Sequence, residues 1–237
     1  SAEVSKHAVN SFLAASLSFI YDIADICEKV GANVADVAAA LRADRRIGQE
    51  AYLDASTGFS GGTLARDLKA LIRQAKEKSI SIPVIESVFE KNNARPLMVA
   101  RILEEELGSL KGKTIGLLGI TYKVGTPVLR HSLPLKIAGD IQERGAAVRV
   151  VDPCSNPSEV VSANPALKMF TDPLALAKDC HAIILLKSCG EFRDIDIAEL
   201  GKNMRAPKLF FDTRNFLRDK EPAFGAAGIK YRGLGCV

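Results

Sequence analysis

The chain has 237 residues, of which 47% are hydrophobic, and its 32 basic and 28 acidic side chains leave a formal net charge of +4. A globular chain of this length buries roughly 70 to 75% of its unfolded surface, which is enough for one or two domains. The charges are mixed without a basic run, so we expect no nucleic-acid partner. Since we find neither a signal peptide nor an apolar run of membrane-spanning length, we expect a soluble, cytoplasmic protein without a membrane partner.

The cysteines and histidines predict no metal site. The five cysteines are odd in number, scattered along the chain and without any C-x-x-C pair, and the three histidines are equally dispersed. This pattern indicates neither a disulfide framework nor a zinc site.

The first half of the chain is predicted to be helical. No proline or glycine occurs from Glu3 to Val30, and Gly31 ends the apolar pattern as a helix C-terminal cap would. Apolar residues cover more than one face of this helix, so it is expected to pack on two sides, one of which could be another subunit. Further helices are expected at 34–42, from about 64 to 78, and at 83–107, where Pro96 would bend or interrupt the helix.

The second half alternates strand and helix patterns. Short buried-strand patterns occur at 114–119, 147–151, 182–186, 208–211 and 229–231, and a helix fits residues 132–144. This alternation predicts parallel β-α-β units with ligands at the carboxyl ends of the strands. The expected fold is α/β: an all-helical domain (1–109), through which the chain could associate with another subunit, followed by a Rossmann-like, doubly wound parallel sheet domain (110–237).

A glycine-rich loop at residues 58–67 leads into the third predicted helix. Gly58, Gly61 and Gly62 lack Cβ atoms, so backbone N–H groups there could approach an anion closely. Near the N-terminus, Lys6 and Asn10 are spaced to project from one face of the first helix. Taken alone, each feature is more typical of an ordinary loop or a solvated helix face.

Together, these motifs resemble the nucleotide-sugar dehydrogenases, the UDP-glucose/GDP-mannose dehydrogenase family. The resemblance rests on the K-x-x-x-N pattern at residues 6–10, the loop at 46–67, the stretch Tyr122-Lys123-Val124-Gly125-Thr126, and Asp212-Thr213-Arg214-Asn215. It covers nearly the whole chain and corresponds to the central and C-terminal domains of the family.

The resemblance implies oxidation of the 6-hydroxyl of a UDP- or GDP-hexose to a uronic acid for polysaccharide biosynthesis, with NAD as the cofactor and a homodimer as the assembly. In that chemistry a cysteine thiolate holds the intermediate aldehyde covalently. This chain has Thr63 at that position, and a hydroxyl is a far weaker nucleophile. The implied catalytic residues are Lys6, Asn10, Thr63 and Asp67.

The same resemblance implies binding residues. Substrate contacts are expected at Arg46, Tyr52, Leu53, Ser56, Phe59, Gly61, Leu64, Lys123 and Arg214. Contacts to the cofactor are expected at Arg66 and Arg130.

The sequence lacks the family's fingerprint for the main cofactor-binding domain. No G-x-G-x-x-G fingerprint follows a predicted strand, so the NAD-binding Rossmann domain of the family is expected to precede Ser1. Two alternatives remain open: a degenerate member that binds a nucleotide sugar without oxidising it, and a dimerisation scaffold without ligands. Retention of Lys6, Asn10, Asp67, Lys123 and Arg214 argues against the scaffold. The sequence leaves the choice between UDP and GDP sugars open.

Overall fold

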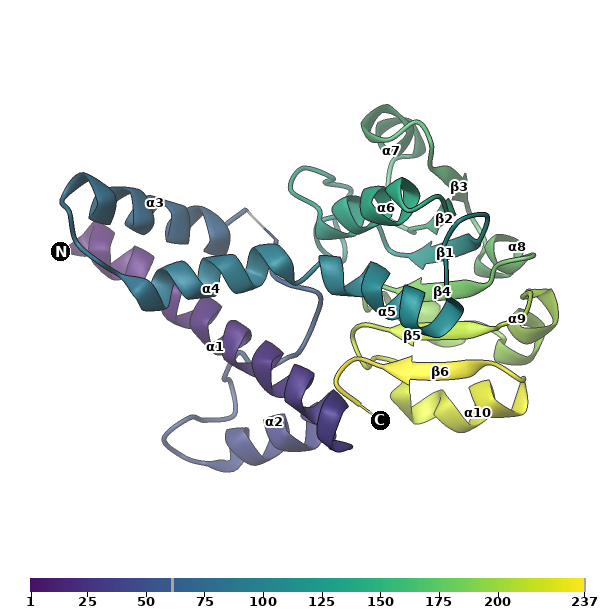
Figure 1. The fold of residues 1–237 in the computed structure, drawn as a ribbon, viewed down its shortest axis with the longest axis horizontal. Coiled ribbons are helices and arrows are strands. Elements are labelled where there is room, and N and C mark those ends of the chain that lie inside the picture. The colour runs from purple at the N-terminus through teal and green to yellow at the C-terminus, as the bar shows by residue number, and fades with distance from the viewer. Residues whose placement is uncertain (61, 237) are drawn as a thin grey trace. The chain divides into compact units, whose positions relative to one another are not determined.

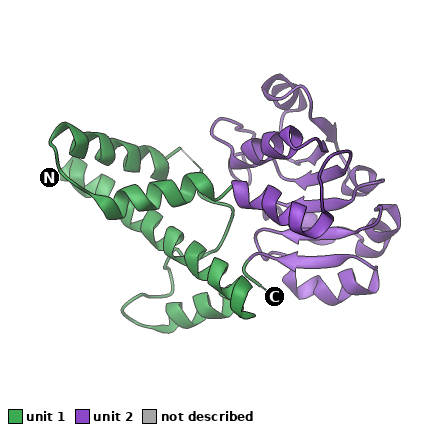
Figure 2. Ribbon diagram, viewed as in Figure 1, with its two compact units in different colours: residues 1–96, 235–237 green, residues 97–234 purple. Residues whose placement is uncertain are grey.

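A computed structural model describes residues 1–60 and 62–236 and divides the chain into two compact units (Figures 1 and 2). Unit 1 consists of Ser1–Pro96 together with Gly235–Val237, and unit 2 consists of Leu97–Leu234. Unit 1 is helical, whereas unit 2 contains the sheet. The expected fold class is therefore confirmed.

Unit 1 is built around one long helix. Its helices are α1 (Ala2–Val30), α2 (Val34–Ala43), α3 (Leu64–Glu77) and α4 (Pro83–Ala94). As predicted, Gly31 ends α1, with a φ of 73° and its N–H donating to the Cys27 carbonyl. Helices α1, α3 and α4 pack on one another, and Figure 1 shows them side by side.

A buried cation, Arg95, lies in the core of unit 1. Arg95, which is 4% exposed, donates from Nε to the Ser56 carbonyl at 3.0 Å and pairs with Asp25. Its guanidinium carbon lies 5.1 Å from the centroid of the Tyr21 ring. The arginine therefore joins α1, α4 and the loop before α3 through charge, hydrogen bonding and ring contact.

The expectation that no apolar run could span a membrane needs correction at α1. Over the described residues, α1 alone is long and apolar enough by length and composition to do so, with a mean hydropathy of 1.2. One such helix is weak support for a membrane protein, because core helices pass the same test. In addition, Asp22 and Asp25 on α1 pair with Lys91 of α4 at 2.5 and 2.8 Å. These ion pairs join α1 to α4 within unit 1.

Pro96 interrupts the helix predicted for 83–107. Helix α4 ends at Ala94 and α5 spans Leu97–Leu107, because a proline lacks the N–H that a continuous helix would need. Helix α5 belongs to unit 2, where Glu106 pairs with Lys230 at 2.6 Å and Arg232 at 2.8 Å. The units thus divide after Pro96, whereas the sequence placed the boundary after residue 109, because the polar segment at 107–113 is only a tight connection inside unit 2.

Unit 2 contains a six-stranded parallel sheet in the order β3-β2-β1-β4-β5-β6. The strands are β1 (Thr114–Leu118), β2 (Ala147–Val151), β3 (Lys168–Phe170), β4 (Ala182–Leu185), β5 (Leu209–Asp212) and β6 (Lys230–Gly233). The strand order reverses between β1 and β4, which is where doubly wound sheets hold their ligands.

The remaining helices of unit 2 follow the strands. They are α6 (Leu133–Glu143), α7 (Pro157–Ala163), α8 (Pro173–Ala177), α9 (Ile197–Asn203) and α10 (Glu221–Ala226), with 3₁₀ helices η1 (Gly190–Asp194) and η2 (Arg218–Lys220). Strand β3 was not predicted. It is a short edge strand whose residues are only partly buried, so it carries no apolar run for the sequence to display.

Candidate active site

In unit 1 a buried carboxylate, Asp67, lies between α1 and α3. Asp67 is 1% exposed, and the Asn10 side-chain amide donates to its Oδ2 at 2.5 Å. Arg66 Nε donates to the other oxygen at 3.2 Å, and His7 Nδ1 lies 3.4 Å from Oδ2. The structure therefore brings together the predicted residues Asn10, Arg66 and Asp67, which come from two helices.

These contacts keep Asp67 ionised. Burial raises the pKa of its carboxyl group, but hydrogen bonds from Asn10 and Arg66, together with the nearby His7 ring and the Arg66 charge, outweigh burial and hold the pKa below its ordinary value. Asp67 is therefore a carboxylate near neutral pH, able to accept a proton or to orient a donor.

His7 is the member of this cluster that the sequence analysis missed. It lies between Lys6 and Asn10 on α1, and its Nε2 is 3.8 Å from Glu3. The signal was present, because positions 3, 7 and 10 follow the helical period and share one face. It was overlooked because His7 belongs to none of the motifs that carry the resemblance.

Thr63, at the expected nucleophile position, is the N-cap residue of α3. Its side chain makes no capping hydrogen bond, and the residue is exposed. The Asp67 N–H donates to the Thr63 carbonyl at 3.0 Å, so the two residues lie one helical turn apart. Across the described residues, no hydrogen bond links the Thr63 hydroxyl to His7 or Asp67. Thr63 therefore has no base in contact that could activate its hydroxyl.

Lys6 is exposed one turn before Asn10 on α1, and no ion pair restrains its ammonium among residues 1–60 and 62–236. Asn10 holds Asp67, whereas Lys6 is free to meet a ligand. The Asn10 amide thus positions Asp67, and the Lys6 ammonium remains available to a ligand.

The predicted substrate loop is only partly open. Arg46 lies on an exposed turn after α2 and pairs with Asp44 at 2.6 Å. Tyr52 is 51% exposed and lines a hollow of about 480 Å³ that also includes Leu17 and Arg42. Arg46 and Tyr52 can therefore contact a ligand from unit 1.

The other side chains of this loop face the core. Leu53 and Phe59 are buried, Leu64 is partly buried against the same cluster, and Ser56 bonds to the Tyr21 hydroxyl at 3.0 Å. The Asn92 side chain accepts a hydrogen bond from the Phe59 N–H at Oδ1 and donates one from Nδ2 to the Phe59 carbonyl, so these backbone groups are already paired. Gly61 lies outside the described residues.

In unit 2 the turn after β1 is filled by a side chain. Asp152, which follows β2, accepts at Oδ2 from the N–H groups of Ile120 at 2.7 Å and Thr121 at 2.9 Å. In a dinucleotide-binding domain, the backbone N–H groups of this turn face the pyrophosphate. Because a carboxylate already occupies them, unit 2 does not fit the pyrophosphate of NAD in that manner.

The predicted cations of unit 2 follow the carboxyl ends of its strands. Lys123 and Arg130 are exposed in the segment after β1, and Arg214 is exposed two residues after β5. The Arg214 N–H donates to Asp212 Oδ1 at 2.9 Å, so Asp212 shapes the turn that carries the arginine.

A further cation at this edge, Lys187, was not singled out from the sequence. Its Nζ donates to the Tyr122 carbonyl at 2.6 Å, and the residue is only partly exposed. Burial, with repulsion from Arg214, lowers the pKa of Lys187 to about 8. Its position just beyond a buried strand at the order reversal was the signal that could have identified it.

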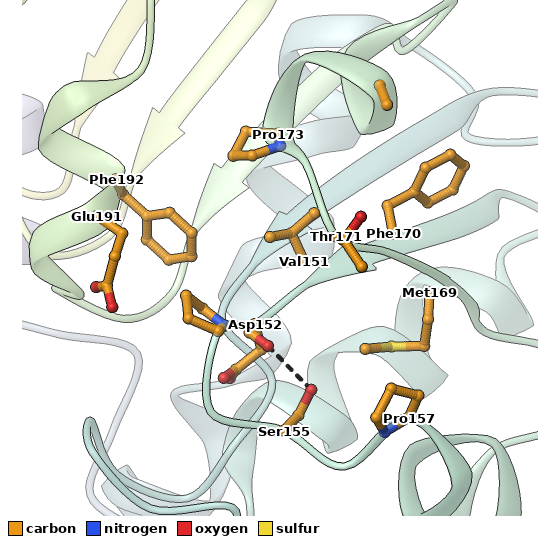
Figure 3. A pocket seen from close by; sticks show the side chains of 12 residues that line it. Val151, Asp152, Ser155, Pro157, Met169, Phe170, Thr171, Pro173, Glu191 and Phe192 are labelled. Carbon is orange, nitrogen blue, oxygen red and sulfur yellow. Dashed lines mark hydrogen bonds between the residues drawn. The ribbon is translucent and has the colours of Figure 1, made fainter.

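A cavity of about 750 Å³ opens beside β2 and β3 (Figure 3). Pro173, Phe170 and Met169 border it, and its charged residues are the acidic Asp152 and Glu191. None of the predicted site residues lines it. A cavity lined by carboxylates, with no lysine or arginine, repels a phosphate. The cations Lys187 and Arg214 are a more favourable place for an anion.

Over residues 1–60 and 62–236, no group of three or more His, Cys, Asp or Glu side chains could hold a metal ion. The described cysteines form no disulfide bond, and burial raises the pKa of the Cys180 and Cys189 thiols to about 11. Neither of these two thiols is a ready nucleophile.

Comparisons with known proteins agree across both units. Residues 1–94 match the UDP-glucose/GDP-mannose dehydrogenase family, central domain, and residues 116–219 match its UDP binding domain. UDP-glucose 6-dehydrogenase TuaD of Bacillus subtilis is 34% identical over 99% of this chain and 50% of its own length. The UDP-glucose 6-dehydrogenase of Rhizobium meliloti is 33% identical over 98% of this chain and 52% of its own.

A solved structure of a UDP-glucose dehydrogenase has a similar fold. The UDP-glucose dehydrogenase of the hyperthermophilic archaeon Pyrobaculum islandicum superimposes with a TM-score of 0.85 and 27% identity, covering 99% of this chain and 51% of that one. The chain belongs to the UDP-glucose/GDP-mannose dehydrogenase family. It spans about half the length of the curated relatives that it matches.

Proposed function

We propose that this chain is the central and C-terminal part of an NAD-dependent dehydrogenase that oxidises the 6-hydroxyl of a UDP- or GDP-hexose for polysaccharide biosynthesis in the cytoplasm. The observation that carries this proposal is the buried Asp67 carboxylate, held by Asn10 one turn from Lys6 and one turn from Thr63. In the whole protein, NAD would accept the hydride, and Arg66 and Arg130 are the contacts to NAD proposed in this chain.

The residues of this chain divide the remaining work. Lys6 carries an exposed positive charge that can stabilise a developing alkoxide, while Asn10 fixes the Asp67 carboxylate. Asp67, ionised near neutral pH, can orient water or accept a proton. In unit 2 the substrate contacts are proposed at Lys123 and Arg214, and in unit 1, taken by itself, at Arg46 and Tyr52.

Thr63 limits the reaction. The second oxidation in the family passes through a covalent thiohemiacetal, and an unactivated threonine hydroxyl cannot supply the thiolate. We therefore propose that the first oxidation survives, whereas the second proceeds slowly through the aldehyde hydrate.

The test compares the full-length wild type with Thr63→Cys, measuring aldehyde and uronic acid formed from UDP-glucose and GDP-mannose. We expect the wild type to release aldehyde and Thr63→Cys to raise uronic acid formation. Ser60→Cys, which places a thiol in the same loop at a position with no predicted role, should behave like the wild type. The assignment of Thr63 is wrong if the wild type forms uronic acid at about 1 to 10³ per second and Thr63→Cys adds nothing.

A second candidate is a member that binds the nucleotide sugar without oxidising it. The absence of any described base in contact with Thr63 favours this reading. Binding of the sugar by the full-length protein with no NAD reduction, in the wild type and in Thr63→Cys alike, would support it over the dehydrogenase.

We propose that the protein is a homodimer that associates through α1. Phe12 is 73% exposed, Phe19 50% and Ile26 54%, and they recur at the heptad spacing of an association seam. A permanent interface of about 2,000 Å² or more is expected along this helix.

A further inference from the structure

We propose that Lys187 and Arg214 together bind the diphosphate group of the nucleotide sugar. No sequence motif identified Lys187 as a binding residue. This inference rests on the proposed function and names a binding group within it.

The register of the sheet brings the two cations together. Leu185 of β4 pairs with Asp212 of β5. Lys187 lies two residues after Leu185, and Arg214 lies two residues after Asp212. The Thr213 N–H donates to the Leu185 carbonyl at 3.1 Å, so the two chains stay side by side beyond the strand ends. Neighbouring strands lie about 4.8 Å apart, which places both cations within reach of one ligand.

Lys187 is held in place by the turn after β1. Gly119 has a φ of 95°, and a Cβ there would lie 2.5 Å from Lys187 Cβ and 2.5 Å from its Cγ. The glycine therefore leaves the space through which the lysine stem passes. The hydrogen bond to the Tyr122 carbonyl, at 2.6 Å, uses one of the three ammonium donors.

Neither cation is neutralised within the described residues. No carboxylate there forms an ion pair with Lys187 or Arg214, although Asp152 lies close enough to act on Lys187 electrostatically. The Asp152 carboxylate is engaged by the N–H groups of Ile120 and Thr121. Two adjacent cations without a paired anion suit a ligand that carries two or more negative charges.

The groups facing Lys187 give a protonation signature. Arg214 after β5 disfavours the ammonium, whereas Asp152 after β2 and Cys189 on the lysine's own segment favour it. Burial is the largest influence, and the resulting pKa is about 8. A bound diphosphate would raise that pKa, so binding at pH 8 should take up about half a proton.

The experiment titrates the 237-residue chain calorimetrically with UDP, inorganic pyrophosphate and uridine. Lys187→Gln is compared with Lys208→Gln, because Lys208 is also partly exposed and donates to a carbonyl, that of Gly201, at 2.6 Å, but lies at the opposite end of β5. We expect Lys187→Gln to weaken UDP and pyrophosphate binding about tenfold or more. Lys208→Gln should bind as the wild type does, and Lys187→Arg should retain most of the affinity. Uridine, which has no phosphate, should be unaffected.

Titrations at pH 8 in buffers of different ionisation enthalpy measure the proton uptake. The wild type should take up about half a proton on binding UDP, and Lys187→Gln none. A purely structural role for Lys187 would not produce this difference. Thermal unfolding shows whether Lys187→Gln is folded; if it is not, Lys187→Met replaces it, and the uptake by the wild type remains a test.

Equal UDP affinity of the wild type and Lys187→Gln would overturn the inference, as would absence of the proton uptake. Failure of the wild type to bind either UDP or pyrophosphate would do the same. If the wild type binds pyrophosphate but not UDP, and Lys187→Gln weakens the pyrophosphate, the diphosphate site stands and the proposed function fails instead.

Discussion

At the scale of single residues, unit 1 contains a carboxylate, Asp67, that is buried and still charged. Burying a charge is costly unless hydrogen bonds and opposite charges replace the lost water. Asp67 has such partners in Asn10, Arg66 and His7. Asn10 therefore stabilises the fold as well as the proposed site.

We predict that Asn10→Ala lowers the free energy of unfolding by about 1 to 3 kcal/mol at pH 7, because Asp67 Oδ2 loses its closest donor. Urea denaturation measures this. Lys6→Ala, one turn away and exposed, should change stability by less than about 0.5 kcal/mol. Equal effects of the two substitutions would contradict the role given to Asn10.

The contribution of Asp67 also has a pH dependence. Since its folded pKa lies below the unfolded value, the ionised group stabilises the fold above about pH 4, and this stability is lost as the pH falls through the folded pKa. The stability advantage of the wild type over Asp67→Asn should therefore be present at pH 7 and shrink toward pH 3.

At the scale of elements, the exposed face of α1 is the clearest feature without an explanation inside one chain. Val9, Phe12, Phe19, Ile26 and Val30 are all at least half exposed on that helix. Large apolar residues that recur along one exposed helix face indicate an association surface.

We predict that Phe19→Glu converts the dimer to a monomer, because a charge at the seam would have to be desolvated on association. Light scattering at micromolar concentration measures the mass. Ile80→Glu removes an apolar residue that is 59% exposed outside α1 and should leave the dimer intact. A wild type that is monomeric at this concentration would refute the assembly.

The turn after β1 is the second element whose geometry can be tested. Gly119→Ala should destabilise the protein by about 1 to 3 kcal/mol more than Gly125→Ala, because both glycines have positive φ but only a Cβ at 119 meets the Lys187 side chain. Chemical denaturation compares the two. Similar losses would show that the backbone conformation alone matters, and that Lys187 does not depend on Gly119.

At the scale of the whole molecule, the proposed ligand of unit 2 is a sugar nucleotide and not a dinucleotide cofactor. The sheet has the strand order typical of dinucleotide-binding domains, but Asp152 occupies the N–H groups that a pyrophosphate would need. The cations Lys123, Lys187 and Arg214 are available for a substrate phosphate instead.

We predict that the chain binds a UDP- or GDP-sugar weakly and does not bind NAD. Each charge-assisted hydrogen bond to phosphate contributes about 1.5 to 3 kcal/mol, which supports affinities in the millimolar to micromolar range. Calorimetry with UDP-glucose, GDP-mannose and NAD decides the matter. Tight binding of NAD, or no binding of either sugar nucleotide at millimolar concentration, would contradict it.

The sequence by itself determined the features that depend on near neighbours. The long helix α1 follows from an uninterrupted stretch without proline or glycine, and its end follows from Gly31, which adopts the left-handed backbone of a C-cap. Pro96 divided two helices as expected, and buried apolar runs located five of the six strands. The motifs that resemble the dehydrogenase family also lie within short segments, so they identified the family correctly.

Only the tertiary structure decided which distant residues meet. The contact between His7 and Asp67, the filling of the β1 turn by Asp152 and the environment of Lys187 each join segments far apart in the chain. Helical and strand periods describe which face a side chain occupies, but not which other segment packs on that face. Burial and charge at a site depend on that packing, so the ionised state of Asp67 and the lowered pKa of Lys187 emerge only from the folded chain.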